Sequence, residues 1–64
     1  MRWSDIQDIA IALCEADPHT DPYGINFVEL RDKVMALDGF EDASSSCGEK
    51  ILEAIQSAWA DERD

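Results

Sequence analysis

Residues 4–16, with the sequence SDIQDIAIALCEA, place apolar side chains at the spacing of an α-helix. Ser4 and Gln7 have the spacing of a capping box, in which the hydroxyl accepts a backbone N–H and the amide reaches back. Pro18 disfavours a helical conformation in the residue before it. The pattern therefore predicts a helix that ends near Asp17. Its buried stripe is expected to contain Ile6, Ile9, Ala10, Leu13 and Ala16.

Another face of the same predicted helix is acidic. Asp5 and Asp8 are three residues apart and Asp8 and Glu15 are seven apart, so the three carboxylates align along one face. Ala12 lies on that face between them. Two further acids, Asp17 and Asp21, extend the negative potential into the segment that follows.

A second helix is indicated after a proline-containing connection. Residues 17–25 carry two prolines and are expected to form an ordered, turn-rich segment. Asn26 is a good helix cap, and Gly39 is a natural stop because glycine tolerates the left-handed conformation past a helix end. The second helix is therefore predicted over about residues 27–38.

A third helix follows a polar linker over residues 41–46. Ser46 and Glu49 have the capping-box spacing, and apolar residues continue from there at helical intervals, so a helix is predicted over about residues 47–61. The chain is accordingly expected to be a single all-α domain over residues 1–64, a small three-helix domain with a compact orthogonal core.

Charge excludes two classes of partner. The 64 residues contain 15 Asp and Glu against 5 Lys and Arg, which leaves a net charge of −10. The basic residues stand at positions 2, 31, 33, 50 and 63 and form no patch in the sequence. Nucleic acid and anionic membranes are therefore poor partners, because both are bound through clustered Lys and Arg.

The sequence also suggests a compartment. No apolar stretch approaches a membrane span, and the first five residues lack the basic-then-apolar layout of a signal peptide, so a cytoplasmic protein is expected. Cys14 and Cys47 are too few for a disulfide scaffold and are expected to be reduced thiols.

No set of residues forms a catalytic motif. His19 is expected to be a polar loop residue, and no phosphate-binding glycine loop or calcium loop is present. Cys14 is expected to be a small packed residue. Cys47 is placed in the first turn of the predicted third helix, where the helix dipole favours a thiolate, and is the more reactive candidate. The chain is therefore not expected to be an enzyme.

The remaining candidate site is the acidic surface. Carboxylates are hard donors that hold di- or trivalent cations without His or Cys. If the first and third helices run roughly antiparallel, the end of the third lies close to Asp5. The candidate metal ligands are then Asp5, Asp8, Glu15, Asp61 and Glu62. The alternative is a solvated surface that keeps a small protein soluble.

The same carboxylates could dock on a basic surface of another protein, since complementary potentials raise the encounter rate and fix the orientation. The candidate partner-binding residues are Asp5, Asp8, Glu15, Asp17, Asp21, Asp61 and Glu62. A metal bound by these carboxylates would compete with that partner or be carried to it.

In the order and spacing of its residues, nearly the whole chain resembles the IscX proteins of bacterial iron–sulfur cluster assembly. The matching elements are Trp3-Ser4-Asp5, Ile9 through Leu13, Pro18, Asp21-Pro22, Phe27 with Leu30, Leu37 with Phe40 and Asp42, the run from Glu49 to Ile55, Trp59, Asp61 and Glu62.

The resemblance implies a small helical domain related to winged-helix modules and an accessory protein without catalytic activity. Members of that family bind the cysteine desulfurase through an acidic surface, bind iron weakly, and are thought to tune desulfurase activity and cluster formation. Other iron–sulfur assembly proteins are further candidate partners, and a monomer is expected. The acids that match the family pattern are Asp5, Glu15, Asp21, Asp42, Asp61 and Glu62, and Asp8 stands at a position that is usually acidic in the family.

The two tryptophans, Trp3 and Trp59, also match and are expected to pack in or beside the core. The chain departs from the family at Cys47-Gly48, where Ser-Asn is usual, and at Cys14, where an aromatic residue is frequent. Neither departure lies on the acidic face.

A hypothesis of a different class is a nucleic-acid-related module, which either binds nucleic acid through the winged-helix frame or mimics the charge of DNA. The net charge of −10 opposes direct binding.

Overall fold

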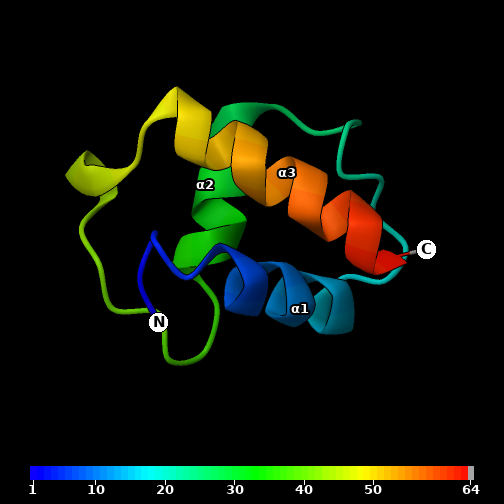
Figure 1. Cartoon of the computed structure of the whole chain (residues 1–64), viewed down its shortest axis with the longest axis horizontal. Helices are drawn as coiled ribbons and strands as arrows, with labels where there is room; N and C mark the ends of the chain where they lie inside the picture. The colour runs from blue at the N-terminus through cyan, green and yellow to red at the C-terminus, as the bar shows by residue number, and fades with distance from the viewer. Residues whose placement is uncertain (64) are drawn as a thin grey trace.

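The computed structural model describes residues 1–63 and contains three α-helices and one turn of 3-10 helix (Figure 1). The elements are α1 (Ile6–Ala16), α2 (Phe27–Met35), η1 (Ser44–Ser46) and α3 (Glu49–Arg63). No strand occurs in this part of the chain, so the all-α prediction is confirmed, while the relation to winged-helix modules stays a prediction. None of the helices within residues 1–63 has the length and apolar content that crossing a bilayer requires.

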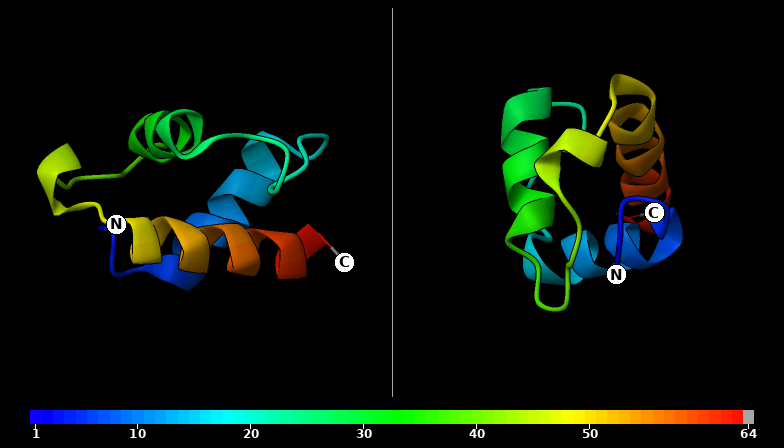
Figure 2. Two further views of the ribbon diagram at one scale, coloured as in Figure 1. Left: turned by 90° about the horizontal axis from the view of Figure 1, so that it is seen from above. Right: turned by 90° about the vertical axis from the view of Figure 1, so that its left-hand side faces the viewer.

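The first and third helices start at the same end of the molecule and advance in the same general direction (Figures 1 and 2). The antiparallel arrangement considered from the sequence is therefore wrong. The connection between α1 and α2 returns the chain along the long axis, and α2 and the linker after it then lead across the molecule to the start of α3 (Figure 1). The most extensive helix packing is between α1 and α3.

The core is formed by the predicted apolar stripes and both tryptophans, with Trp3 only 2% exposed and Trp59 fully buried. The prediction that the tryptophans pack in the core is confirmed. Trp3 also meets the ring of Phe40 edge to face, with ring centroids 4.8 Å apart. The buried core residues are Trp3, Ile9, Ala10, Leu13, Leu30, Val34, Leu52, Ile55 and Trp59. Ala16, placed in the stripe by its spacing, is exposed because α1 ends there.

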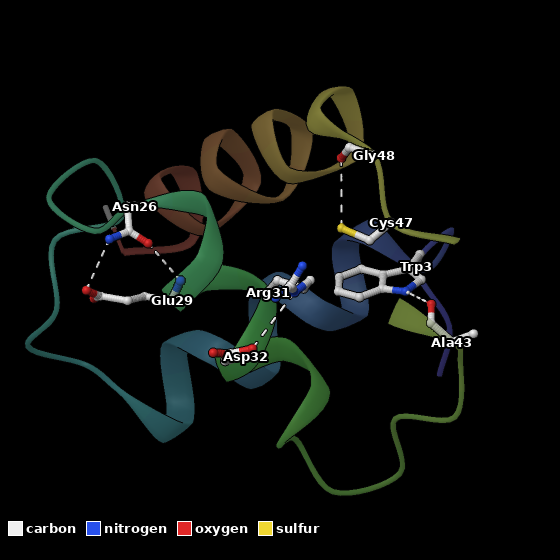
Figure 3. A network of polar contacts seen from close by, with 8 residues as sticks. All are labelled: Trp3, Asn26, Glu29, Arg31, Asp32, Ala43, Cys47 and Gly48. Carbon is white, nitrogen blue, oxygen red and sulfur yellow. Dashed lines mark hydrogen bonds and ion pairs between the residues drawn. The ribbon is translucent and has the colours of Figure 1, made fainter. Parts of the chain in front are cut away.

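Helix caps follow the sequence signals at α2 but not at α1. The Asn26 side chain accepts the backbone N–H of Glu29 at 2.9 Å, as a cap should (Figure 3). At α1 the cap position is Asp5, with no side-chain cap bond, so the capping box of Ser4 and Gln7 is wrong. A turn closed by the Asp5 N–H on the Arg2 carbonyl at 2.9 Å precedes the helix instead, and Gln7 contacts α3.

Three predicted helix ends shift by two or three residues, one of them the end of the third helix, which extends to Arg63 rather than 61. The second helix stops at Met35 rather than 38, and Gly39 adopts φ 81° in the turn that follows. The third starts at Glu49 rather than 47, with the Gly48 carbonyl accepting the first helical N–H, from Leu52, at 3.1 Å. Ser46 is not its cap because it belongs to η1.

The N-terminal residues are fastened across the segment after α2. The Met1 ammonium donates to the Gly39 carbonyl, and the Glu41 N–H donates to the Met1 carbonyl at 2.8 Å. The Trp3 indole N–H donates to the Ala43 carbonyl at 2.9 Å (Figure 3). Residues 39–43 are thus fixed to the start of the chain although they contain no regular structure.

Candidate functional site

The acidic face predicted on α1 is present. Asp8 and Glu15 are exposed, and Ala12 lies half-buried between them on the side of α1 turned away from the core residues. We call Asp8, Ala12 and Glu15 the α1 stripe. No hydrogen bond or ion pair within residues 1–63 occupies the Asp8 or Glu15 carboxylate.

Spacing along the helix limits what these carboxylates can share. A rise of about 1.5 Å per residue separates Asp8 from Glu15 by about 10 Å and Asp5 from Asp8 by about 4.5 Å. Only the second pair is close enough for one small cation. Asp5 is half-buried, and its Oδ2 already accepts the Arg2 N–H at 2.8 Å.

The end of α3 meets α1 on a different side from the α1 stripe. The Glu62 carboxylate accepts from the Gln7 amide, and the Glu62 carbonyl accepts from the Cys14 thiol at 3.8 Å. Gln7 and Cys14 are seven residues apart and therefore share one face of α1, which is not the face of Asp8 and Glu15. The structure thus places Glu62 against the face of Gln7 and Cys14 rather than at the stripe.

The five candidate metal ligands accordingly do not converge. Across residues 1–63 no three His, Cys, Asp or Glu side chains come together at a point where they could hold a metal ion. A resident, preorganised metal centre does not fit these residues. Weak binding of iron by one or two carboxylates stays a prediction.

The loop carboxylate Asp17 is bound within the protein. Its Oδ1 accepts from the Thr20 hydroxyl at 2.8 Å, and its Oδ2 pairs with the Lys33 ammonium. The contact with Lys33 is the main reason that the pKa of Asp17 lies below its usual value, and the hydrogen bond from Thr20 adds to it. Asp21 likewise accepts the Tyr23 N–H at 3.0 Å and so supports its own turn.

Asp42 has a similar internal role at the other end of the molecule. Its carboxylate accepts the Ala43 N–H at 2.8 Å and the Trp3 N–H at 3.2 Å. These two backbone hydrogen bonds hold the pKa of Asp42 below its usual value. Asp42 therefore fastens the N-terminal residues and is not part of the α1 stripe.

The prediction that Cys47 is the more reactive thiol needs correction. Cys47 lies two residues before α3, half-buried, and burial raises the pKa of its thiol while the Arg31 charge opposes this. The thiol therefore ionises less readily, and the residue lies before α3 rather than in its first turn, where it was predicted. Cys14 packs half-buried against the core, as expected.

Two of the five basic residues are paired with acids. Lys33 is bound to Asp17, and the Arg31 Nε lies 3.8 Å from an oxygen of its neighbour Asp32 (Figure 3). This arrangement gives no support to the nucleic-acid hypothesis.

Several of the candidate acids are already bound within the protein, which their spacing in the sequence did not indicate. A local signal existed at Asp21, because an aspartate before a proline commonly accepts the N–H two residues on. No local signal could show the contact of Asp42 with Trp3, since the two residues are 39 positions apart.

The chain is similar to known proteins over its full length. A family model described as iron–sulphur cluster assembly matches residues 1–64. An uncharacterized protein of Pseudomonas aeruginosa is 50% identical over 64 residues, which cover all of this chain and 97% of that protein. The similarity therefore extends over the helices, the loops and the α1 stripe together.

Proposed function

The chain belongs to the iron–sulphur cluster assembly family, the IscX family, and we propose that it serves cluster assembly as a non-catalytic accessory protein in the cytoplasm. In this proposal it binds a basic surface of the cysteine desulfurase through the α1 stripe and thereby modulates desulfurase activity and cluster formation. The exposed loop position of His19 and the raised pKa of Cys47 support a role without covalent or acid–base catalysis.

The observation that carries the proposal is the difference among the carboxylates. Asp17, Asp21 and Asp42 accept hydrogen bonds from groups of the protein itself. Asp8 and Glu15, by contrast, have no hydrogen-bond or ion-pair partner within residues 1–63. Exposed carboxylates in a row, on a chain of net charge −10, are complementary to Lys and Arg on another protein.

Charge reversal at one stripe position tests the docking face. Asp8→Lys should raise the Kd for the organism's cysteine desulfurase by about tenfold or more, because it places a cation against a basic surface. Glu53→Lys is the matched control: Glu53 is exposed on α3, outside the stripe, and the substitution makes the same change in net charge. Calorimetric titration of the wild type and both variants gives the three Kd values.

The same titration should depend on salt. The wild-type Kd should rise steadily between about 0.05 and 0.3 M NaCl, because screening shortens the range of charge attraction between exposed groups. Equal affinities of Asp8→Lys and the wild type, together with indifference to salt, would show that the α1 stripe is not the docking face.

Iron is proposed to be cargo that is held weakly and exchanged with solvent. Asp5 and Asp8 are the pair close enough to share an ion, and one oxygen of Asp5 is already used by the Arg2 N–H, so water must complete the coordination. Anaerobic titration with ferrous iron should broaden the amide signals of residues 5–8 most strongly. Asp8→Asn should abolish this local broadening while Glu53→Gln leaves it unchanged; broadening centred elsewhere would place the ion at another site.

A further inference from the structure

The α1 stripe continues into a surface hollow that also involves the turn after α2. This hollow has a volume of about 400 Å³ and is lined by Ala12, Glu15, Ala16, Leu37 and Asp38. The ion pair of Lys33 with Asp17 ties α2 to the C-terminal end of α1, where the hollow lies. The sequence prediction could not place Asp38 there, because it extended the second helix through that residue.

A neighbouring hollow has a different electrostatic character. It has a volume of about 230 Å³ and shares Ala16 and Leu37 with the first. The charged groups on its wall are Asp17 and Lys33, which are bound to each other. In the larger hollow, by contrast, neither Glu15 nor Asp38 has a hydrogen-bond or ion-pair partner within the described chain.

The larger hollow therefore combines two alanines and a half-buried leucine with two unneutralised carboxylates. An arginine side chain has the matching construction, since its apolar stem packs on apolar surface while its guanidinium stays in contact with water and acceptors. The planar guanidinium also donates to carboxylates in pairs and is less strongly hydrated than an ammonium. The volume lies within the range of about 300–1,000 Å³ usual for ligand sites.

We propose that this hollow is an arginine-binding subsite, in which a basic partner inserts one arginine between Glu15 and Asp38 with its stem on Ala16 and Leu37. The inference rests on the proposed function, because it makes the hollow the place where the docking face gains its specificity. Long-range attraction by the α1 stripe orients the partner, and the hollow selects one side chain of it.

A small probe tests the subsite without any protein partner. N-acetyl-arginine methylamide, titrated at low salt into the methyl-labelled protein, should give saturable shifts of the methyl signals of Ala12, Ala16 and Leu37. The citrulline analogue has nearly the same shape without the charge and should not. Glu15→Gln with Asp38→Asn should weaken the arginine effect by about fivefold or more, since both charged acceptors are lost.

The matched control removes two charges elsewhere. Glu41→Gln with Glu53→Gln changes the net charge equally, and both side chains are exposed outside the hollow. This control should titrate like the wild type. Equal shifts from arginine and citrulline, or no saturable shift from arginine, would overturn the subsite.

The complex with the cysteine desulfurase provides the second test. Ala16→Phe fills the hollow with no change in charge, and position 16 is exposed at the last residue of α1, so the fold should survive, as the unfolding midpoint will show. It should raise the Kd by about tenfold, because an anchoring side chain is excluded from its pocket. Glu15→Gln with Asp38→Asn provides the same readout if Ala16→Phe perturbs the fold.

The two proposals fail in different ways. If the wild type binds the desulfurase and Asp8→Lys weakens it, but the hollow variants bind normally, the subsite is wrong and the docking face stands. If the arginine probe binds in the hollow while the desulfurase ignores Asp8→Lys, the docking face is wrong and the subsite stands.

Discussion

The acids in the loops and the acids on the open face of α1 differ in what they contact. Asp17, Asp21 and Asp42 accept hydrogen bonds from nearby backbone or side-chain groups, and the pKa values of Asp17 and Asp42 are lowered as a result. Asp8 and Glu15 have no such contacts within residues 1–63. The carboxylates behind the net charge of −10 therefore differ in role: some stabilise the fold, and others are free to contact other molecules.

The difference has a simple cause. Beyond the first turn of a helix each backbone N–H is satisfied by the carbonyl four residues earlier, so Glu15 finds no free backbone donor beside it. Asp8 stands in the first turn of α1, where N–H groups lack such partners, but its carboxylate accepts no hydrogen bond there. In turns and connections the N–H groups lack these partners, and aspartate is the side chain best placed to accept from them. In this chain Asp17, Asp21 and Asp42 are bound to neighbouring groups, whereas Asp8 and Glu15 are not.

The largest expected effect is on the structural side of the comparison. Trp3→Ala should lower the free energy of unfolding by about 3–5 kcal/mol, because it removes a side chain that is 98% inaccessible and that Asp42 and Ala43 hold in place. If that variant does not fold, Trp3→Phe retains a ring and loses the indole hydrogen bond, at a cost of about 1 kcal/mol. Denaturant unfolding followed by Trp59 fluorescence measures both, and a wild-type midpoint for Trp3→Ala would contradict the assigned role.

The pH dependence of stability should come from the loop carboxylates. The pKa values of Asp42 and Asp17 lie below the ordinary 3.8 in the folded protein, so their contribution to stability is complete above that value. This contribution to stability is lost as the pH falls below 3.8 and through the lowered pKa values. The folded protein must then protonate carboxylates that act as hydrogen-bond acceptors. Thermal midpoints recorded from pH 2 to 7 should therefore decline in acid.

Matched variants separate the two groups of acids in that experiment. Asp17→Asn with Asp42→Asn should lower the midpoint at neutral pH and make its decline in acid shallower. In Asp8→Asn with Glu15→Gln, the thermal midpoint should fall with decreasing pH as steeply as it does in the wild type. Equal slopes in all three proteins would show that the loop carboxylates are not the source of the pH dependence.

A smaller effect is expected when the α1 stripe is neutralised at neutral pH. Asp8→Asn with Glu15→Gln should change the free energy of unfolding by no more than about 0.5 kcal/mol, since neither carboxylate has a partner to lose. Chemical denaturation compares the variant with the wild type. A large loss of stability would mean that the stripe has a structural role after all.

The smallest effect is expected where α1 meets the end of α3. Gln7→Ala removes the donor to the Glu62 carboxylate at an exposed position, so the global stability should change by less than about 0.5 kcal/mol. Amide exchange in the last turn of α3, residues 60–63, should nevertheless become faster because that turn is less firmly held. Unchanged exchange there would show that the contact does not restrain α3.

The local features of the fold were predictable from the sequence, because each depends on residues within about four positions of one another. The helices, their buried stripes and the Asn26 cap belong to this group, and the order of matching residues also indicated the family. The structure confirmed the three helices, the Asn26 cap and the buried stripes apart from Ala16, and the comparisons confirmed the family. The Ser4 cap failed because a turn closed by Asp5 and Arg2 competes with it over the same few residues.

Only the tertiary structure decided which acids are free. The connections before and after α2 set how the helices meet, and this takes Glu62 to Gln7, Asp42 to Trp3, and Asp38 to the hollow beside Glu15. These residues are far apart in the chain, and no local pattern states how the chain returns to itself. The sequence by itself determined where the carboxylates stand along each helix, and the packing of the core determined which of them have partners.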